Sequence, residues 1–171
     1  MKIEIRPAAA GDVDGIFAMM LRAAAAPIGL ARRPDEITRD YVAGFVANSL
    51  ARGLILVADG EGGVCGMIQA CTPQPKLFAH VLSDLTIAID PAVQGQGLGR
   101  RLFTAFLDTA RSQRPHIRRV ELYCRPDNPR GYPFYESLGF VIEGRLKGRV
   151  HAGDGVYLDD LFMGLDLTAP A

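Results

Sequence analysis

The first part of the chain distributes apolar and polar residues with the period of amphipathic helices. After Asp12, which suits an N-cap position, apolar residues recur at intervals of three and four over residues 13–24. A second helix is predicted from Pro34, in its first turn, to about Arg52, with Gly53 as the C-terminal stop. The two patterns predict a pair of helices, each with one face turned to a core.

The middle of the chain changes to the short apolar runs of β-strands. Residues 54–59 and 64–72 flank a glycine-rich turn at residues 60–63, which predicts a hairpin. A third run, residues 81–90, supplies a central strand after prolines have interrupted the sheet pattern. Residues 98–110 return to helical periodicity with an apolar face opposite charged positions, so this helix is expected to lie on the sheet.

The complete order of elements is that of a layered α/β fold. A strand at residues 120–124, a helix and two final strands follow, so the chain reads strand, two helices, three strands, helix, strand, helix, two strands. The sequence contains no internal repeat, low-complexity stretch or linker. Its 171 residues are enough to bury a proper core. We therefore expect one domain over residues 1–171.

Composition and charge narrow the class of protein. Apolar residues make up 49% of the chain and the formal net charge is zero, without a basic stripe or acidic tail, which argues against a nucleic-acid partner. No apolar run approaches the length of a membrane-spanning helix. The charged start of the chain, residues 1–4, lacks the apolar core of a signal peptide. We therefore expect a cytoplasmic protein with no membrane partner.

The cysteines and histidines give no sign of a metal site. Cys65, Cys71 and Cys124 are odd in number and form no C-x-x-C pair, and the three histidines are scattered. This usage is typical of reduced, mostly buried thiols, and no metal is predicted.

The segment from residue 87 to residue 101 runs from an apolar strand through a short loop into a glycine-rich turn that opens a helix. The first N–H groups of a helix have no partner inside it and carry partial positive charge, so such a turn can hold a phosphate by main chain alone. Glycines at positions 95, 97 and 99 remove the Cβ atoms that would block this approach. The dinucleotide fingerprint fails because Arg100 stands where its last glycine is needed, and the P-loop fails because no lysine follows Gly99. An ordinary strand-to-helix turn is the alternative.

Three motifs resemble those of one enzyme superfamily. Residues 94–99, Q-x-x-G-x-G, resemble the Q/R-x-x-G-x-G/A motif of the GNAT (Gcn5-related N-acetyltransferase) superfamily. Residues 128–140 are similar to its segment N-x-x-A-x-x-L/F-Y-x-x-x-G-F. Residues 143–145 and 154–163 resemble the E-G-x and D-G-x-Y-x-D-x-x-x-M pattern of members that acetylate amino acids and similar small amines. With matches near the N-terminus, the resemblance covers nearly the whole chain.

The resemblance implies an α/β (α+β) fold with a mixed, mostly antiparallel central sheet of about seven strands and about four flanking helices. It implies an N-acetyltransferase with acetyl-CoA as co-substrate, which moves the acetyl group to the primary amine of a small molecule by direct attack on the thioester. The acceptor would be an amino acid or an amino-bearing toxin or antibiotic, and a homodimer is compatible with the resemblance. Two alternatives stay open: acetylation of a protein N-terminus or lysine, and a catalytically silent acetyl-CoA-binding module.

The resemblance also assigns the residues that hold acetyl-CoA. The turn holds the pyrophosphate, and the strand before it offers main-chain groups to pantetheine at a bulge, while its side chains belong to the core. Asn128 contacts the cofactor's arm in the family, although a helix N-cap or Asx-turn explains this residue nearly as well. The expected cofactor-binding residues are Ile87, Ile89, Gln94, Gly95, Gln96, Gly97, Leu98, Gly99, Arg100, Asn128 and Tyr135.

Tyr135 matches the family's tyrosine that protonates the departing coenzyme A thiolate. With reference pKa values of about 10 for tyrosine and about 8.5 for a thiol, this transfer is uphill by about 2 kcal/mol. The alternative is that Tyr135 packs its helix against the sheet beside Phe134. Gly131 replaces the family's alanine and Pro133 lies in the first turns, so the helix is expected to start late.

The general base is less defined. Asp84 lies on the central strand, where some family members use a carboxylate, and His80 stands at the entry of that strand. Asp84 could instead pair with an arginine, and His80 could be a surface residue. An ordered water chain or an unaided free amine would remove the need for a base.

The acceptor side of the site is expected at two places. In the family the loop between the first two helices, here residues 27–33, overhangs the acceptor. Asp159 shares a strand face with Tyr157 by alternation, which predicts a half-buried carboxylate in need of a partner. Asp159 either holds the acceptor's ammonium group, with Tyr157 beside it, or caps a loop.

Overall fold

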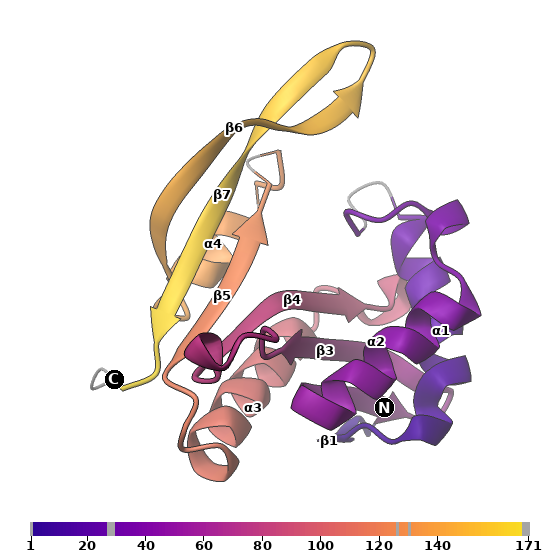
Figure 1. The fold of residues 1–171 in the computed structure, drawn as a ribbon. Helices are drawn as coiled ribbons and strands as arrows, with labels where there is room; N and C mark the ends of the chain where they lie inside the picture. The colour runs from indigo at the N-terminus through magenta and orange to yellow at the C-terminus, as the bar shows by residue number, and fades with distance from the viewer. Residues whose placement is uncertain (1, 27–29, 126, 130, 169–171) are drawn as a thin grey trace. The chain divides into compact units, whose positions relative to one another are not determined.

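The computed structural model describes residues 2–26, 30–125, 127–129 and 131–168, which form seven β-strands and four α-helices. The strands are β1 (Glu4–Pro7), β2 (Gly53–Gly60), β3 (Gly63–Cys71), β4 (Val81–Ile89), β5 (Arg119–Cys124), β6 (Val141–Gly153) and β7 (Val156–Asp166). The α-helices are α1 (Val13–Ala24), α2 (Arg39–Arg52), α3 (Leu98–Gln113) and α4 (Gly131–Glu136). The strand order in the sheet is β1-β2-β3-β4-β5-β7-β6 (Figure 1). The predicted order of elements and the mixed, mostly antiparallel sheet are confirmed.

The chain forms two compact units. The first comprises Met1–Cys71 and Thr86–Arg114, and the second comprises Thr72–Leu85 and Pro115–Ala171. Strand β4 begins in the second unit and ends in the first. The single domain over residues 1–171 stays a prediction. Among the helices that the structure describes, none combines the length and the apolar character that a bilayer span requires.

The sheet of the first unit is covered on both faces. Strands β1, β2 and β3 pair antiparallel, and residues 53–58 and 64–71 are buried without alternation. Such continuous burial is typical of strands with a layer on each side. Ile55 and Val57 belong to a core cluster with α1 and α2, and α3 packs on β2 and β3.

The second helix starts later than the sequence predicts. Pro34–Glu36 form a single 3-10 turn, and α2 begins only at Arg39. Between them, Ile37 is buried with an extended backbone, and the Thr38 hydroxyl caps α2 by accepting a first-turn N–H at 3.1 Å. The prediction of a continuous helix from Pro34 was wrong because an apolar anchor in extended conformation leaves no separate signal in the pattern. The predicted end at Arg52 is confirmed.

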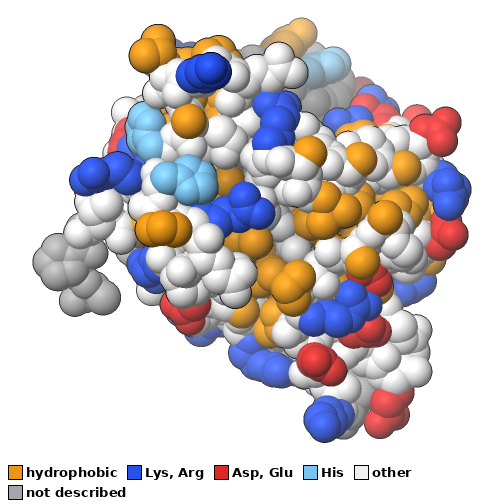
Figure 2. All heavy atoms as spheres, turned by 60° about the horizontal axis from the view of Figure 1, so that its bottom comes forward, with side chains coloured by type: hydrophobic (Ala, Val, Ile, Leu, Met, Phe, Trp, Pro, Cys, Tyr) orange, Lys and Arg blue, Asp and Glu red, His pale blue; other side chains and the backbone are white. Residues whose placement is uncertain are grey.

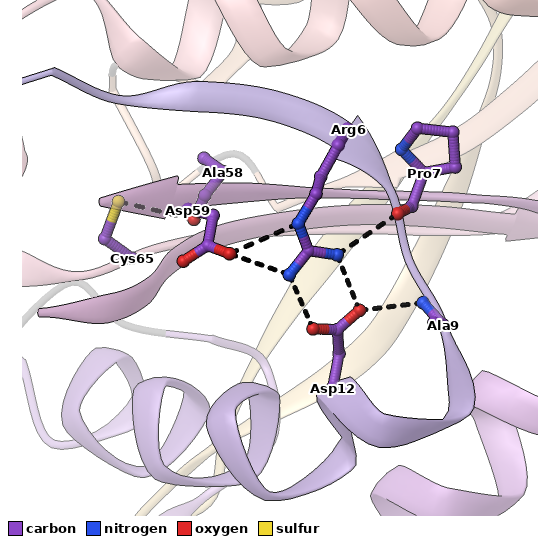
Figure 3. A network of polar contacts seen from close by, with 7 residues as sticks. All are labelled: Arg6, Pro7, Ala9, Asp12, Ala58, Asp59 and Cys65. Atoms are coloured by element: carbon purple, nitrogen blue, oxygen red, sulfur yellow. Dashed lines mark hydrogen bonds and ion pairs between the residues drawn. The ribbon is translucent and has the colours of Figure 1, made fainter. Parts of the chain in front are cut away.

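Asp12 holds the predicted N-cap position of α1, but its carboxylate makes no capping bond to the helix. It accepts hydrogen bonds from Arg6 Nη1 and Nη2 at 2.9 and 2.7 Å and from the Ala9 N–H at 2.7 Å (Figure 3). Arg6 Nη2 also donates to Asp59 at 2.7 Å. The guanidinium of Arg6 therefore joins β1, the start of α1 and β2.

In the second unit, β5 lies between β4 and β7. Strand β4 runs parallel to β5, with Val81 opposite Arg119, and β5 pairs antiparallel with β7. Strands β6 and β7 form a long antiparallel hairpin with shifts in register (Figure 1). Arg119 on β5 donates to Glu121 at 2.6 Å and to Glu143 on β6. The buried side chains of this unit include Val120, Leu122, Phe140, Leu161 and Met163.

Helix α4 begins at Gly131, so the predicted late start was wrong. Pro133 is its third residue and lies within the first turn, where the missing N–H needs no helical partner. The Gly131 N–H donates to Asn128 Oδ1 at 3.1 Å. A Cβ at position 131 would lie 2.9 Å from Asn128 Nδ2 and 3.0 Å from Cys124 Sγ. Close packing therefore requires glycine here, in place of the family's alanine.

Candidate functional site

The glycine turn predicted to bind phosphate leads directly into α3 in the first unit. Gly95 and Gly97 have φ angles of 77° and 76°, and Gly97 is the N-cap residue of α3. Glycine adopts this left-handed conformation at no steric cost, whereas other residues are strained in it. Among the residues that the structure describes, none lies within 4 Å of a Cβ added at either position, so these residues leave the space in front of the turn open.

The start of α3 carries backbone N–H groups that its own helical hydrogen bonds do not use. Its first helical hydrogen bond runs from the Arg101 N–H to the Gly97 carbonyl at 3.1 Å. The N–H groups of Leu98, Gly99 and Arg100 precede this bond, and helix geometry gives them no acceptor inside α3. With the dipole of a 16-residue helix behind them, they are the groups expected to bind an anion, and this role stays a prediction. The exposed residues of the turn are Gln94, Gly95, Gln96, Gly97 and Arg100. Leu98 is buried, so only its main chain can face an anion.

A buried aspartate holds the beginning of the turn. The Asp90 N–H donates to the Cys65 carbonyl at 2.9 Å, and Asp90 Oδ1 accepts the Ala92 N–H at 3.0 Å. Asp90 Oδ2 accepts a hydrogen bond from Arg22 Nε on α1 at 2.7 Å. Neither Arg22 nor Asp90 was singled out from the sequence. The sequence could have indicated Asp90 as a turn residue, since it is an aspartate before a proline. No local pattern indicates Arg22, which is distant from the turn in sequence.

The end of β4 offers main-chain groups beside the turn. Ile87 and Ile89 have half-buried side chains, and only Ala88 between them is fully buried. The expectation that both isoleucines belong to the core was wrong, because they end the strand next to an exposed turn. The residue of β4 with left-handed backbone is Asp84, with φ 53°, so the irregularity of this strand precedes Ile87. Gln94 Nε2 donates to the Ile89 carbonyl at 3.1 Å and steadies the turn from its other side.

A cavity of about 290 Å³ opens in the first unit and is bordered by α1, the segment before α2, α2 itself and β4. The lining residues are Met20, Leu30, Ala31, Arg32, Glu36, Tyr41 and Thr86. The Arg32 guanidinium lies over the Tyr41 ring, with Cζ 4.1 Å from the ring centroid. The cavity thus combines apolar walls with one cationic and one acidic side chain.

This cavity contains part of the loop expected to overhang the acceptor. Leu30, Ala31 and Arg32 belong to the loop of residues 27–33, of which residues 27–29 lie outside the described residues. The other lining residues come from α1, α2, β4 and the 3-10 turn before α2. No motif marks them, because their proximity results from the packing of these elements.

In the second unit, Tyr135 lies on α4 and packs among aromatic rings. Its ring centroid is 5.4 Å from that of Phe134 and 6.1 Å from that of Phe140. Burial raises the pKa of Tyr135 to about 12, and the nearby Cys124 thiol adds to this rise. The phenol therefore keeps its proton at neutral pH, as a general acid must. The packing role is seen directly, and the acid role stays a prediction.

Asn128 caps α4, as the N-cap alternative predicts, because its side-chain oxygen accepts the N–H of Gly131, the first residue of that helix. Its contact with the cofactor stays a prediction.

His80 and Asp84, the two predicted bases, are exposed. The His80 carbonyl accepts the N–H groups of Arg118 and Arg119 at 2.8 and 3.2 Å, which fixes the backbone at the entry of β4. The catalytic roles of His80 and Asp84 stay predictions.

Asp159 on β7 has two partners inside the β6–β7 hairpin. Its Oδ1 accepts the Gly148 N–H at 3.0 Å, and its Oδ2 accepts Arg145 Nη1 at 3.2 Å. The bond from Gly148 and then that from Arg145 lower the pKa of Asp159. Tyr157 is exposed and stacks on His151, with ring centroids 4.9 Å apart. Asp159 thus links β7 to β6, and not to a loop as the capping alternative predicted, and the acceptor roles of Asp159 and Tyr157 stay predictions.

Known proteins resemble the chain in sequence and in fold. The sequence model of the Acetyltransferase (GNAT) family matches residues 20–140. The L-amino acid N-acyltransferase MnaT of Escherichia coli (strain K12) is 30% identical over 127 residues, which are 74% of this chain and 72% of that protein. The L-methionine sulfoximine/L-methionine sulfone acetyltransferase of Salmonella typhimurium is 27% identical over 134 residues, 78% of this chain and 77% of that protein. The structure of yncA from Salmonella typhimurium with its cofactor acetyl-CoA has the same fold, with a TM-score of 0.82 at 24% identity over 100% of this chain and 97% of that one.

Proposed function

Because the chain belongs to the acetyltransferase (GNAT) family, we propose that it transfers the acetyl group of acetyl-CoA to the primary amine of a small amino acid. Acetyl-CoA is the co-substrate and N-acetyl transfer is the reaction. The acceptor class is the part that we propose. It is supported by two relatives named for amino-acid or amino-acid-like acceptors and by the cavity of the first unit.

The charges in that cavity carry the proposal. An amino acid brings a carboxylate and an ammonium group, and the cavity is lined by one guanidinium, Arg32, and one carboxylate, Glu36. A guanidinium binds carboxylates through two parallel hydrogen bonds. The volume of about 290 Å³ lies at the lower end of the range for ligand pockets, which is about 300–1,000 Å³. Met20 and Leu30 provide apolar contacts for the side chain of a small acceptor.

The glycine turn holds acetyl-CoA in this proposal. The N–H groups at the start of α3 receive the pyrophosphate, with the exposed Gln94, Gln96 and Arg100 around it. The main-chain groups of Ile87 and Ile89 receive the pantetheine and the acetyl carbonyl, and Asn128 and Tyr135 complete the cofactor side. The geometry that supports this assignment is the open space in front of two left-handed glycines.

Transfer needs a neutral amine, which attacks the thioester carbonyl, and a proton for the departing thiolate. Tyr135 supplies that proton in our proposal. With its pKa raised to about 12, proton transfer to a thiolate of reference pKa about 8.5 is uphill by about 5 kcal/mol, more than the sequence suggested. The site must therefore offset this cost with a preorganised hydrogen bond from the phenol to the sulfur.

A basic peptide acceptor is less well supported. Steering of a basic peptide requires a field of negative sign. The formal net charge is zero, and on the face drawn in Figure 2 acidic and basic side chains alternate with apolar ones.

The cytoplasmic location and a homodimer are further parts of the proposal. Sedimentation equilibrium with and without acetyl-CoA checks the homodimer.

Steady-state release of coenzyme A thiol with a panel of amines tests the proposed function. Wild-type protein should acetylate small L-amino acids in preference to their amides, to a polyamine and to a basic peptide. Arg32→Gln should raise the KM for an amino acid by about 10-fold or more, since a charge-assisted hydrogen bond contributes about 1.5–3 kcal/mol, and should change the KM for the amide little. Arg33→Gln, outside the cavity lining, is the matched control. Equal effects of Arg32→Gln on acid and amide would refute the carboxylate contact.

A further inference from the structure

An aromatic ring, and not a carboxylate, holds the Arg32 guanidinium in the cavity of the first unit. Its Cζ lies 4.1 Å from the centroid of the Tyr41 ring, and both side chains line the cavity. Among the described residues of this unit, the ion pairs of arginine, such as Arg22 with Asp90, do not include Arg32. The charge of Arg32 is therefore held in place without being neutralised.

The Tyr41 ring is itself fixed by α2 and the core. Its residue lies in the first turn of α2, where the Tyr41 N–H donates to the capping Thr38 hydroxyl at 3.1 Å. Phe45 follows on the same face of the helix, and the two rings pack edge to face with centroids 5.4 Å apart. Both rings pack against the core cluster of the first unit. The ring thus offers a rigid surface to the cavity.

Arg32 needs such a surface because its own segment gives it little support. Residues 30–33 form neither helix nor strand, and the Arg32 side chain is exposed. A free arginine side chain has many rotamers, and a ligand that binds it must overcome the entropy of ordering them. An aromatic face attracts the cation without supplying a hydrogen-bond acceptor of its own kind, so the fork of N–H donors stays available for a carboxylate.

The negative charge of the cavity is held separately. Glu36 ends the 3-10 turn that Pro34 opens, and its Oε2 accepts the Arg33 N–H at 2.8 Å. Among the ion pairs of the described residues, none joins Glu36 to Arg32. Without the guanidinium, the cavity would keep an aromatic face and a carboxylate, and this combination attracts ammonium groups.

We propose that the pair of Arg32 and Tyr41 determines which charge the acceptor carries beside its reacting amine. Tyr41 is a positioning residue that holds Arg32 ready for a carboxylate. Arg32 in turn covers the aromatic face and repels a second ammonium group, so that diamines are rejected by the same contact that selects amino acids. This inference rests on the proposed function, which sets the acceptor's carboxylate against Arg32 and its ammonium group against Glu36.

Tyr41→Leu tests the positioning role by release of coenzyme A thiol with three acceptors. These are the small L-amino acid that wild-type protein acetylates best, the amide of that amino acid, and 1,4-diaminobutane. Tyr41→Leu should raise the KM for the amino acid by about 3-fold or more, since the contact of the cation with the ring is lost, and should change the KM for the amide little. Tyr41→Phe keeps the aromatic face and should keep the ratio of the two KM values near that of wild type.

Tyr123→Leu is the matched control for the loss of a ring beneath an arginine. The Arg149 Cζ lies 4.0 Å from the centroid of the Tyr123 ring in the second unit, and neither residue lines the cavity. This variant should resemble wild type with all three acceptors. Thermal unfolding shows whether each variant folds, and the KM for the amide serves as the reference within each variant for a general loss of structure.

Arg32→Gln tests the rejection of diamines. It uncovers the Tyr41 ring beside Glu36, so the KM for 1,4-diaminobutane should fall by about 3-fold or more, while the KM for the amino acid rises. Adding Tyr41→Leu to Arg32→Gln should cancel the gain for the diamine. The double variant should also raise the KM for the amino acid no further than Arg32→Gln alone, because Tyr41 acts through Arg32.

Two results would overturn the inference while the proposed function stands. In one, Arg32→Gln separates amino acid from amide but Tyr41→Leu affects both equally, or the two substitutions add independently, which leaves Tyr41 without a positioning role. In the other, the KM for 1,4-diaminobutane does not fall in Arg32→Gln, which removes the rejection of diamines. Failure of the proposed function has a different signature: wild-type protein acetylates no amino acid, or Arg32→Gln affects amino acid and amide equally, and the inference then falls with it.

Discussion

Arg22 on α1 donates a hydrogen bond from Nε to Asp90 Oδ2 at 2.7 Å, and this ion pair joins the helix that borders the cavity to the start of the glycine turn. Asp90 also accepts the Ala92 N–H and donates its own N–H to the Cys65 carbonyl. Three elements distant in sequence thus meet at one buried carboxylate. The position of the turn that we propose to bind the pyrophosphate depends on this anchor as well as on its glycines.

Arg22→Met should weaken acetyl-CoA binding, because Asp90 would lose its charged partner and the turn its anchor. Loss of a charge-assisted partner from a buried group costs about 1–3 kcal/mol of stability, and the Kd for acetyl-CoA should rise severalfold. Isothermal titration and thermal unfolding measure the two effects. Arg39→Met removes the exposed pair with Asp14 and is the control that should leave the Kd unchanged. Equal Kd values for wild type and Arg22→Met would remove Arg22 from the cofactor site.

Gly99→Ala should keep the stabilisation by acetyl-CoA, and the free protein should fold normally. The family motif accepts alanine at this position, and among the described residues a Cβ there would meet Ile89 Cγ1 at an ordinary contact distance of 3.9 Å. The readout is the concentration-dependent rise in Tm that binding to the native state produces.

Gly97→Val provides the comparison for Gly99→Ala. At Gly97 the φ of 76° strains any side chain, so this variant should both lose the acetyl-CoA shift and unfold at a lower temperature. A full thermal shift in a folded Gly97→Val variant would contradict pyrophosphate binding at the turn.

The turn could be recognised from sequence because its chemistry depends on residue type at fixed spacing. Three glycines around the start of a helix indicate a backbone that an anion can approach, whatever surrounds them, and Tyr135 also lies in a motif of fixed spacing. The partners Arg22 and Asp90 are far apart in sequence, and nothing in the sequence distinguishes the buried Asp160 from its half-buried neighbour Asp159. Burial and proximity are products of packing, and a single sequence does not display them.

Helices and strands were predicted correctly where the local residue pattern indicates one structure. Their boundaries were missed where tertiary contacts determine the first residue. The regular spacing of apolar residues predicted α3, and continuous apolar runs predicted the hairpin of β2 and β3. The start of α2 depends on the anchoring of Ile37 in the core, and the start of α4 at Gly131 depends on the space left by Asn128 and Cys124. Proline and glycine counted against an early start of α4 because their local preferences were considered without their neighbours.

Tyr135→Phe should lower kcat by about 100-fold or more and change the affinity for acetyl-CoA little. The phenyl ring keeps the contacts with Phe134 and Phe140, whereas the proton for the thiolate is lost. Phe134→Leu, which alters packing but no proton donor, is the control for a structural effect. Unchanged turnover of Tyr135→Phe, under conditions where chemistry limits the rate, would leave Tyr135 with packing alone.

Arg6→Met should destabilise the protein at neutral pH and have less effect in acid. Hydrogen bonds from Arg6 hold the pKa of Asp12 below its ordinary value, so this pair stabilises the fold above the unfolded pKa of about 3.9 and loses its contribution as the pH falls through the lowered pKa. The difference in Tm between wild type and variant should therefore narrow below about pH 4. A difference that is constant from pH 7 to pH 3 would show that Arg6 acts through packing.

Asp159→Asn separates the two roles that the sequence left open for this residue. Both carboxylate oxygens have partners within the hairpin, Gly148 and Arg145, and asparagine keeps one acceptor for the Gly148 N–H but loses the ion pair. An exposed ion pair contributes little to stability, so we expect a small fall in Tm and unchanged KM values for both substrates. Arg145→Gln, which removes the same ion pair from the other side, should reproduce this result. A rise in acceptor KM for Asp159→Asn alone, with an unchanged KM for acetyl-CoA, would instead place Asp159 against the acceptor's charged group.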